Sequence, residues 1–182
     1  MTPPPPALPP PPQTPLQVTP GELELADALA LATGERSGPV RITIPTGTHS
    51  VPPIRFDGQT SAAELWIVGD SIETELELSG PMTQMPGSPK VHLVGMKILG
   101  EIDVQGSKLE MVGCVIASGD RRGAGRALRA LGETESAAAD MNARAVRVSG
   151  GELVIVDSLL QNQPAGALLV TGGVLNVRNS TL

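Results

Sequence analysis

The sequence predicts an all-β fold in which short strands stack as parallel coils of about 22 residues. One observation is an eight-residue pattern of alternating apolar residues that runs through a turn residue to an aliphatic one. Its five copies are LWIVGDSI, VHLVGMKI, LEMVGCVI, LVIVDSLL and LNVRNSTL. A second observation is a shorter pattern, apolar-x-apolar-x-Gly, that also occurs five times. Alternation over three to five residues that ends in a turn residue is typical of short strands joined by corners.

The copies keep a common register along the chain. Residues 146–160 match residues 168–182 at an offset of 22, with a Gly-Gly pair at the same place in both. The eight-residue copies start 26, 18, 44 and 22 residues apart. We assign the departures from 22 to a loop over residues 80–90 and to an insertion over residues 118–143, which shows no strand alternation.

Stacked coils place equivalent residues above one another, about 4.8 Å apart. A single coil cannot bury its apolar side chains alone, so each coil depends on the coils next to it. Because aromatic residues make up only 1% of the chain, the predicted core is aliphatic. The four predicted inward columns are Leu65-Val91-Leu109-Leu153-Leu175, Ile67-Leu93-Met111-Ile155-Val177, Ile72-Ile98-Ile116-Leu160-Leu182 and Phe56-Leu78-Val104-Val148-Val170.

The N-terminal part of the chain differs from the coils. Residues 1–18 are predicted to form a proline-rich disordered arm, since ten of the first twenty residues are proline. This arm is either a spacer or a PxxP ligand for SH3-type or WW-type grooves. Residues 19–34 are predicted to form a capping helix, with a capping box at Thr19 and Glu22 and a stop at Gly34.

The solenoid domain is predicted to cover residues 19–182. The pattern reaches Leu182 at an inward position, and an uncovered coil exposes both apolar core and an unpaired strand edge. We therefore expect either that the chain is a fragment of a longer repeat protein, truncated at its C-terminus, or that its last coil is capped by a partner.

Three features carry a resemblance to a known family: coils such as SGGELVIVDSLL, the entry segment VRITIPTGTH and the predicted N-terminal helix. Together they resemble the right-handed parallel β-helix of the pectin-lyase-like superfamily. The resemblance implies a single right-handed β-helix and an extracellular or cell-surface location. The first twenty residues lack the apolar region of a secretory signal, so the location follows from the resemblance alone. A leucine-rich repeat has a similar period, but its LxxLxLxxN motif and helical return segment do not match.

Composition argues against several classes of function. The net charge is -6 and the basic residues form no stripe, which argues against nucleic acid as a partner. No run of apolar residues is long enough to span a bilayer. The single cysteine, Cys114, excludes an internal disulfide, and two histidines are too few for a histidine metal triad. We expect no metal and no cofactor.

The candidate ligand site lies on an outward column of the first strand of each coil. Trp66, the only tryptophan, is predicted to be exposed there, one rung from His92 and two from Glu110. Lys90 and Lys108 lie beside these residues. An exposed indole flanked by polar groups is a usual platform for a sugar ring. Alternatively, the indole packs beneath the proline-rich arm or the insertion.

Two further surfaces complete the prediction. In the insertion, Arg121 and Arg122 either form part of a lid that meets an acidic ligand such as a uronate, or belong to a plain excursion of the surface. That excursion would shield an outward apolar column, Val68-Val94-Val112-Val156. The second strands carry a charged outward column, which predicts two modest cross-strand ion pairs. These are Arg55 with Glu77 and Asp103 with Arg147.

No catalytic residue is assigned. Lyases of the resembled superfamily use clustered aspartates for calcium with a basic residue, and its hydrolases use a small group of aspartates; neither set is present. Asp157 over Asn179, and Ser158 over Ser180, instead predict a ladder of corner residues. The predicted function is a non-catalytic repeat or surface protein that presents a rigid face to a polysaccharide or another protein. The alternative is a polysaccharide lyase, glycoside hydrolase or epimerase acting on an acidic polysaccharide, with its catalytic coils missing or degenerate.

Overall fold

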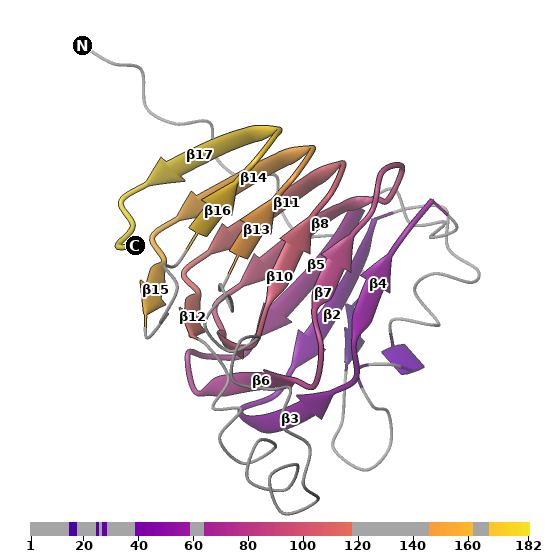
Figure 1. The fold of residues 1–182 in the computed structure, drawn as a ribbon. Helices are drawn as coiled ribbons and strands as arrows, with labels where there is room; N and C mark the ends of the chain where they lie inside the picture. Colours follow the sequence, from indigo (N-terminus) through magenta and orange to yellow (C-terminus); the bar gives the residue numbers. More distant parts are fainter. Residues whose placement is uncertain are drawn as a thin grey trace, which may run out of the picture.

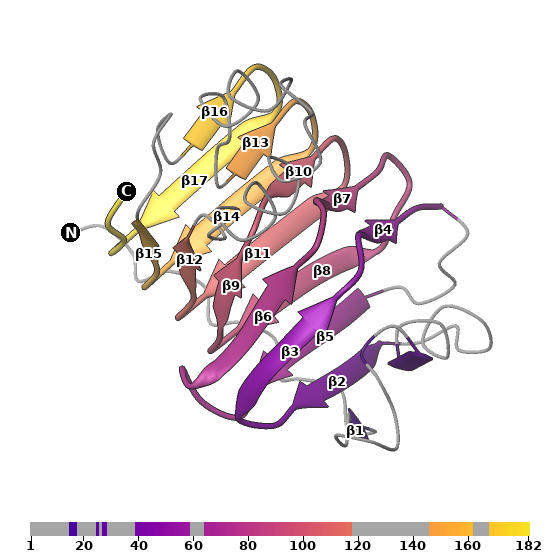
Figure 2. The same ribbon diagram turned by 60° about the horizontal axis from the view of Figure 1, so that its bottom comes forward.

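Three parallel β-sheets surround one aliphatic core (Figure 1). The structure is a computed structural model, and it describes residues 15–17, 25, 27, 28, 39–58, 64–117, 146–161 and 168–182. The chain visits the sheets in turn, so that each coil contributes one strand to each sheet (Figure 2). This arrangement confirms the predicted parallel solenoid.

The first sheet, sheet A, is the longest. Its seven strands, in spatial order, are β1 (Pro15–Gln17), β2 (Val40–Ile44), β5 (Glu64–Gly69), β8 (Lys90–Val94), β11 (Lys108–Val112), β14 (Glu152–Val156) and β17 (Val174–Arg178). Neighbouring strands pair without a shift of register, and two predicted columns lie in this sheet. The column through Leu65 and Leu153 and the column through Ile67 and Ile155 both point inward, as predicted, and begin one coil earlier at Val40 and Ile42.

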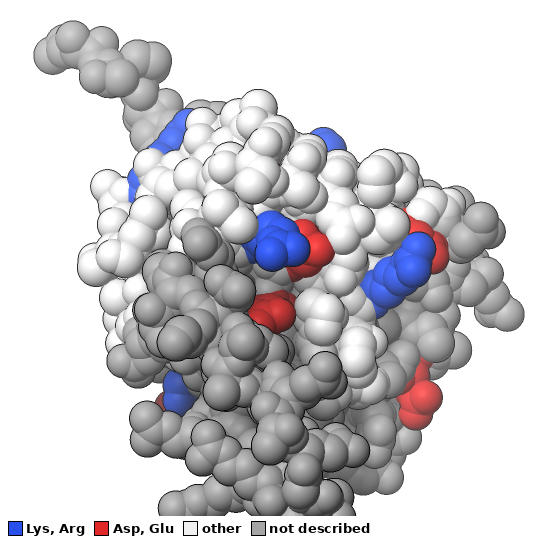
Figure 3. All heavy atoms as spheres, viewed as in Figure 1, with Lys and Arg blue, Asp and Glu red and all other residues white. Residues whose placement is uncertain are grey.

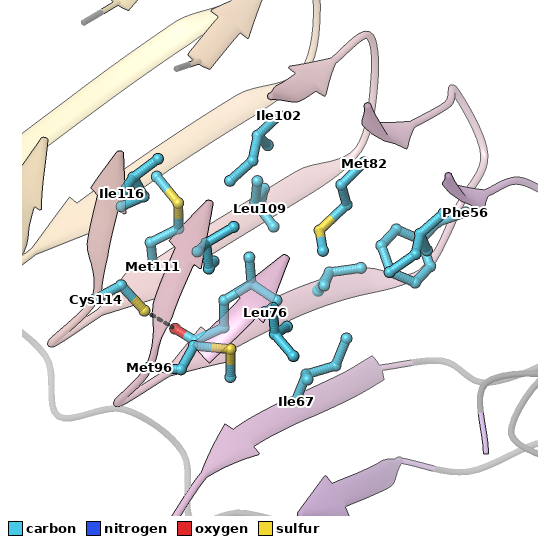
Figure 4. Close-up of a cluster of buried hydrophobic side chains, with 14 of the residues drawn as sticks. Phe56, Ile67, Leu76, Met82, Met96, Ile102, Leu109, Met111, Cys114 and Ile116 are labelled. Atoms are coloured by element: carbon cyan, nitrogen blue, oxygen red, sulfur yellow. Dashed lines mark hydrogen bonds between the residues drawn. The ribbon is translucent and has the colours of Figure 1, made fainter. Parts of the chain in front are cut away.

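Sheets B and C close the coil. Sheet B contains β3 (Gly47–Val51), β6 (Thr74–Leu78), β9 (Lys97–Leu99), β12 (Val115–Ala117) and β15 (Leu159–Gln161). Sheet C contains β4 (Ile54–Phe56), β7 (Met82–Gln84), β10 (Ile102–Val104), β13 (Val146–Val148) and β16 (Leu168–Val170). Side chains from all three sheets meet in the interior, as the close-up of the core shows (Figure 4).

The predicted column in sheet B is wrong at one position. Ile72 is 51% exposed at the corner between β5 and β6, and the neighbour of Ile98 is Leu76 instead. The segment LELSG, residues 76–80, is one of the five copies of the shorter pattern, and that pattern predicts a strand that turns a corner into sheet A. The strand β6 that contains Leu76 belongs to sheet B, so the inward column runs from Leu76 through Ile98 and Ile116 to Leu160.

The predicted column in sheet C is wrong in the same coil. Residues 80–90, predicted to be a loop, contain strand β7, and Gln84 rather than Leu78 lies between Phe56 and Val104. A polar residue at an inward position hid this strand from the apolar pattern. The buried Gln84 amide donates from Nε2 to the carbonyl oxygens of Pro89 at 3.0 Å and Lys108 at 2.8 Å. These bonds offset the cost of burying Nε2, whereas Oε1 is buried without a hydrogen-bond donor among the described residues.

The same correction removes one predicted ion pair. Thr83, not Glu77, lies beside Arg55 in sheet C, and Glu77 lies in sheet B, where Ser50 Oγ is 3.4 Å from its carboxylate. Asp103 and Arg147 are register partners, as predicted. The Asp103 carboxylate, however, accepts its hydrogen bond from Gln105 Nε2, at 2.8 Å.

Glycine and short polar residues turn the corners. Gly151 has a φ of +71°, and a Cβ there would lie 2.4 Å from the carbonyl oxygen of Ser107, so no other residue fits without moving the backbone. At the next corner, Ser158 Oγ accepts from the amide of Cys114, and Ser180 Oγ accepts from the amide of Ser158, both at 3.1 Å. This confirms the predicted serine ladder.

The predicted arm, capping helix and insertion lie mostly outside the described residues. Three arm residues, Pro15–Gln17, form β1, which pairs in parallel with β2. Of the predicted helix, Leu25 and Ala28 are described as buried against the core. The insertion, residues 118–143, lies outside the described residues. In the described part of the chain, no helix is long and apolar enough to cross a membrane.

Candidate functional site

The outer face of sheet A brings the predicted candidate residues together. Trp66 on β5, His92 on β8 and Glu110 on β11 occupy adjacent rungs of one outward column, because the strands pair in register. The side chains alternate in and out along each strand, so residues two apart share a face. Glu64 and Lys90 begin their strands on this same outer face.

Trp66 is not exposed. Its side chain points outward, as predicted, yet only 3% of the residue is accessible, so the prediction of an exposed indole is wrong. The indole stacks on the His92 imidazole, with ring centroids 3.9 Å apart and planes inclined by 8°. The stack covers one face of the indole, and the low accessibility of the residue means that the indole is not open to a sugar ring.

His92 lies between two carboxylates. Its Nε2 is 2.8 Å from Glu64 Oε1, at hydrogen-bonding geometry. Its Nδ1 is 3.1 Å from Glu110 Oε2, but off the direction of a hydrogen bond, so this contact is electrostatic. The two carboxylates approach opposite sides of the ring. Such an arrangement holds the imidazole in place.

Glu64 was not among the predicted site residues. It precedes Trp66 by two positions, so strand alternation alone places it on the same outer face, diagonal to His92. That period-two relation was the signal in the sequence that identifies it.

Basic residues border this cluster. Lys90 is exposed at the start of β8, and Lys108 Nζ lies 3.5 Å from Glu152 Oε2 on the next strand. Asn176 Nδ2 donates to the same Glu152 carboxylate at 3.1 Å. The two other predicted basic residues, Arg121 and Arg122, lie outside the described residues. Sheet A therefore places five of the seven candidate residues on one face.

An apolar column runs beside the polar one. Val68, Val94, Val112 and Val156 follow one another in register on the outer face, and each is half-buried. Trp66 Nε1 and Arg41 Nε are also buried near this face, and neither has a hydrogen-bond acceptor among the described residues. Arg41 is the register neighbour of Trp66 on β2.

Cys114 does not belong to this face. Its thiol points into the core, near Met96 and Met111 (Figure 4), with Sγ 3.3 Å from the carbonyl oxygen of Leu93. Burial raises the pKa of the Cys114 thiol, because the thiolate would lose its hydration. The side chain acts as a small apolar residue. Within the described ranges, no group of three or more His, Cys, Asp or Glu side chains is arranged to hold a metal ion.

The geometry defines the protein as a parallel β-solenoid with a mixed polar and apolar face on sheet A. The chain matches no protein-family model, no curated protein and no solved structure. Figure 3 shows one face of the molecule in the orientation of Figure 1; on it, acidic and basic residues lie side by side in a few places among uncharged described residues.

Proposed function

We propose that the protein is a non-catalytic β-solenoid whose sheet A presents a rigid face to a partner protein. The observation that carries this proposal is the outward valine column of sheet A, which runs over four consecutive strands. An apolar strip bordered by charged groups on the outside of a sheet is typical of interaction surfaces. A purely solvated face would have polar residues at these positions.

The polar column supports a structural role for its own residues. Glu64 and Glu110, on the strands to either side, each contact His92, and Trp66 stacks on the His92 ring. These contacts hold the strands in register and fix the shape of the face beside the valines. A surface fixed before binding loses little entropy when a partner docks, which favours affinity.

The burial of Trp66 supports a protein rather than a glycan as the partner. A sugar platform needs an open aromatic face, whereas the indole is covered and stacked on His92. Within the enzyme alternative, a glycoside hydrolase needs two carboxylates that flank the scissile bond of the substrate. Glu64 and Glu110 are aimed at His92 instead.

We propose, further, that the coils wind to the right, as in the pectin-lyase-like superfamily. Connections between parallel strands of one sheet are right-handed in almost all cases, because strand twist favours that hand. The glycine corner at Gly151 and the serine ladder at Ser158 support the likeness that the sequence suggests.

A site-specific photo-crosslinker tests the proposed face. Placed at Val112 in the native cells, it is expected to yield one recurrent crosslinked protein. Placed at Leu169, a half-buried apolar residue on the outer face of sheet C, it is the matched control and is expected to yield none. The same crosslinked proteins at both positions would contradict the proposal.

A second measurement distinguishes a glycan partner. The fluorescence of Trp66, the only tryptophan, is followed during titration with uronate and with neutral oligosaccharides. We expect no saturable change, because the indole is covered. A saturable change with either sugar would overturn the choice of a protein partner in favour of a glycan.

A further inference from the structure

The stacked rings of Trp66 and His92 are buried, although both point away from the core. Trp66 is 3% exposed and His92 is 2% exposed. The stack covers one face of each ring, and the strands to either side flank the pair. All the described strands belong to the three sheets, so none of them lies over the outer face of sheet A. The burial of the indole therefore points to a further segment of chain over this face.

Two donors at the same place lack an acceptor. Trp66 Nε1 and Arg41 Nε are buried, and neither has a hydrogen-bond acceptor among the described residues. Arg41 on β2 and Trp66 on β5 are register partners, so both side chains belong to one row of the outer face. A buried N–H group without an acceptor is costly, so the covering segment should supply carbonyl oxygens here.

The strand β1 brings the proline-rich arm to this row. Pro15 is the register partner of Arg41, which is in turn the register partner of Trp66. Two strand spacings separate Pro15 from Trp66, roughly 10 Å. A polyproline II chain advances about 3.1 Å per residue, so residues about three to six positions before Pro15 can reach over the indole. These residues are Pro9–Pro12.

Most other segments outside the described residues start far from this row. Residues 118–145 and residues 162–167 each leave sheet B and return in sheet C. The corner between those two sheets lies across the core from sheet A. The chain between β1 and β2 contains Leu25 and Ala28, which pack in the core cluster rather than over the indole. Residues 59–63 join sheet C to the start of β5 and are the competing occupant.

A proline-rich segment has the chemistry that the two donors require. Eight of residues 1–14 are proline, and polyproline II makes no internal hydrogen bonds, so its carbonyl oxygens are free to accept. Proline has no N–H group, so the segment buries few donors of its own. Residues 1–14 also contain no charged side chain that would lose its hydration beside the indole. Aromatic-lined grooves are the usual binding sites for such segments.

We propose that Arg41 and Trp66 form a polyproline-binding site, and that the chain's own residues Pro9–Pro12 occupy it. Carbonyl oxygens of this segment accept hydrogen bonds from Trp66 Nε1 and Arg41 Nε, and its pyrrolidine rings cover the outer edge of the indole. The segment is stiff before it docks, and β1 tethers it close to the site. Docking therefore loses little entropy and occurs at a high effective concentration.

This site goes beyond the proposed function. Arg41 and Trp66 lie on β2 and β5, whereas Val112, the position of the photo-crosslinker, lies on β11, two strands beyond β5. The two proposals have different readouts, because a crosslink from Val112 reports the partner protein and Trp66 reports the arm. Failure of one leaves the other standing.

The emission of Trp66, the only tryptophan, tests the site in the full chain. Replacing all four residues of Pro9–Pro12 with serine keeps the carbonyl oxygens but removes the rings and the preformed polyproline II conformation. We expect a red shift of the emission maximum and a several-fold rise in quenching by acrylamide. The same replacement of Pro3–Pro6 is the matched control, and it is expected to change neither, because these residues lie beyond the indole along the chain.

A bimane label tests the contact directly, because tryptophan quenches bimane only at close range. Ala7→Cys carries the label next to the docked block and keeps every proline, while the native Cys114 is buried and stays unlabelled. We expect strong quenching at position 7, little at the control Thr2→Cys, and recovery of the position 7 emission when Trp66→Phe is added.

Either measurement can overturn the proposal. Unchanged Trp66 emission after replacement of Pro9–Pro12, or an unquenched label at position 7, overturns it in favour of residues 59–63 as the cover. A red shift of equal size from the Pro3–Pro6 control overturns the placement of Pro9–Pro12 over the indole.

Discussion

The two ends of the solenoid contain residues of the same inward columns, but these residues differ in their exposure to solvent. At the N-terminal end Val40 and Ile42 are fully buried, and Leu25, Ala28 and the strand β1 lie against that end. At the C-terminal end Val177, in the column of Ile42, is more than one-third exposed. The residue types are alike, so the difference teaches that burial depends on what is stacked on a coil.

The largest expected effect contrasts an interior rung with the end rung. Ile155→Ala removes buried methyl groups from a core that coils cover on both sides, so it should lower the free energy of unfolding by about 2–5 kcal/mol. Val177→Ala, in the same column, should cost less than about 1 kcal/mol because the site is partly solvated. Urea unfolding at a concentration where the chain is monomeric measures both. Equal losses would contradict the comparison.

The next largest effect is expected at the corner glycines, which test how closely neighbouring coils are stacked. Gly151→Ala forces a Cβ to within 2.4 Å of the carbonyl oxygen of Ser107, at a φ of +71°. We expect a loss of about 2 kcal/mol or more, since strain and a backbone clash combine. Gly113→Ala has a similar φ of +62° with no atom within 4 Å, so only the backbone strain of about 1 kcal/mol remains. Thermal unfolding that ranks Gly113→Ala as the worse variant would exclude close stacking at this corner.

A smaller effect comes from the thiol inside the stack. Burial raises the pKa of Cys114 above its ordinary value of 9.0. The thiol therefore binds its proton more tightly in the folded state than in the unfolded state. Its contribution to stability is complete below pH 9 and declines as the pH rises toward the folded pKa. The urea midpoint should therefore fall above pH 9, and Cys114→Ala should remove part of that fall. Identical pH profiles for both proteins would show that the thiol is solvated.

The smallest expected effect is on the outer face. Lys108 and Glu152 form an ion pair across β11 and β14, and both side chains are about one-third exposed. Solvent screens such a pair, so Lys108→Met should change the free energy of unfolding by less than about 1 kcal/mol. Chemical denaturation in low and high salt checks this. A loss comparable to that of Ile155→Ala would mean that the outer face, rather than the core, holds the coils together.

Much of the fold could be predicted from the sequence. The register of sheet A follows from the repeated apolar alternation, because a one-residue slip would turn Leu109 and Leu153 outward. The second coil could not be predicted in full, since Gln84 occupies an inward position through hydrogen bonds that no pattern of apolar residues reveals. The resemblance of LELSG to the shorter pattern then shifted Leu76 to the wrong sheet.

For the candidate site, the sequence predicts the direction in which the side chains point but not how accessible they are to solvent. Alternation places Trp66 and His92 on the outer face, and register makes them neighbours. Whether an outward residue is exposed depends on what lies over it, which the spacing of residues does not encode. The sequence also offered Glu64 by its period-two relation to Trp66, yet a carboxylate at the start of a strand is usually solvated. Its bond to His92 depends on the stack that fixes the imidazole.

The central claim is that the coils stack in parallel and in register, and paired spin labels at Arg55 and Leu169 test it most directly. These outward residues of sheet C are linked through Thr83, Asp103 and Arg147. Four strand spacings predict a narrow distance distribution near 19 Å between backbones, at about 4.8 Å per step. Dilution with unlabelled protein removes pairs between copies. A broad distribution extending beyond about 30 Å would contradict the stacked solenoid.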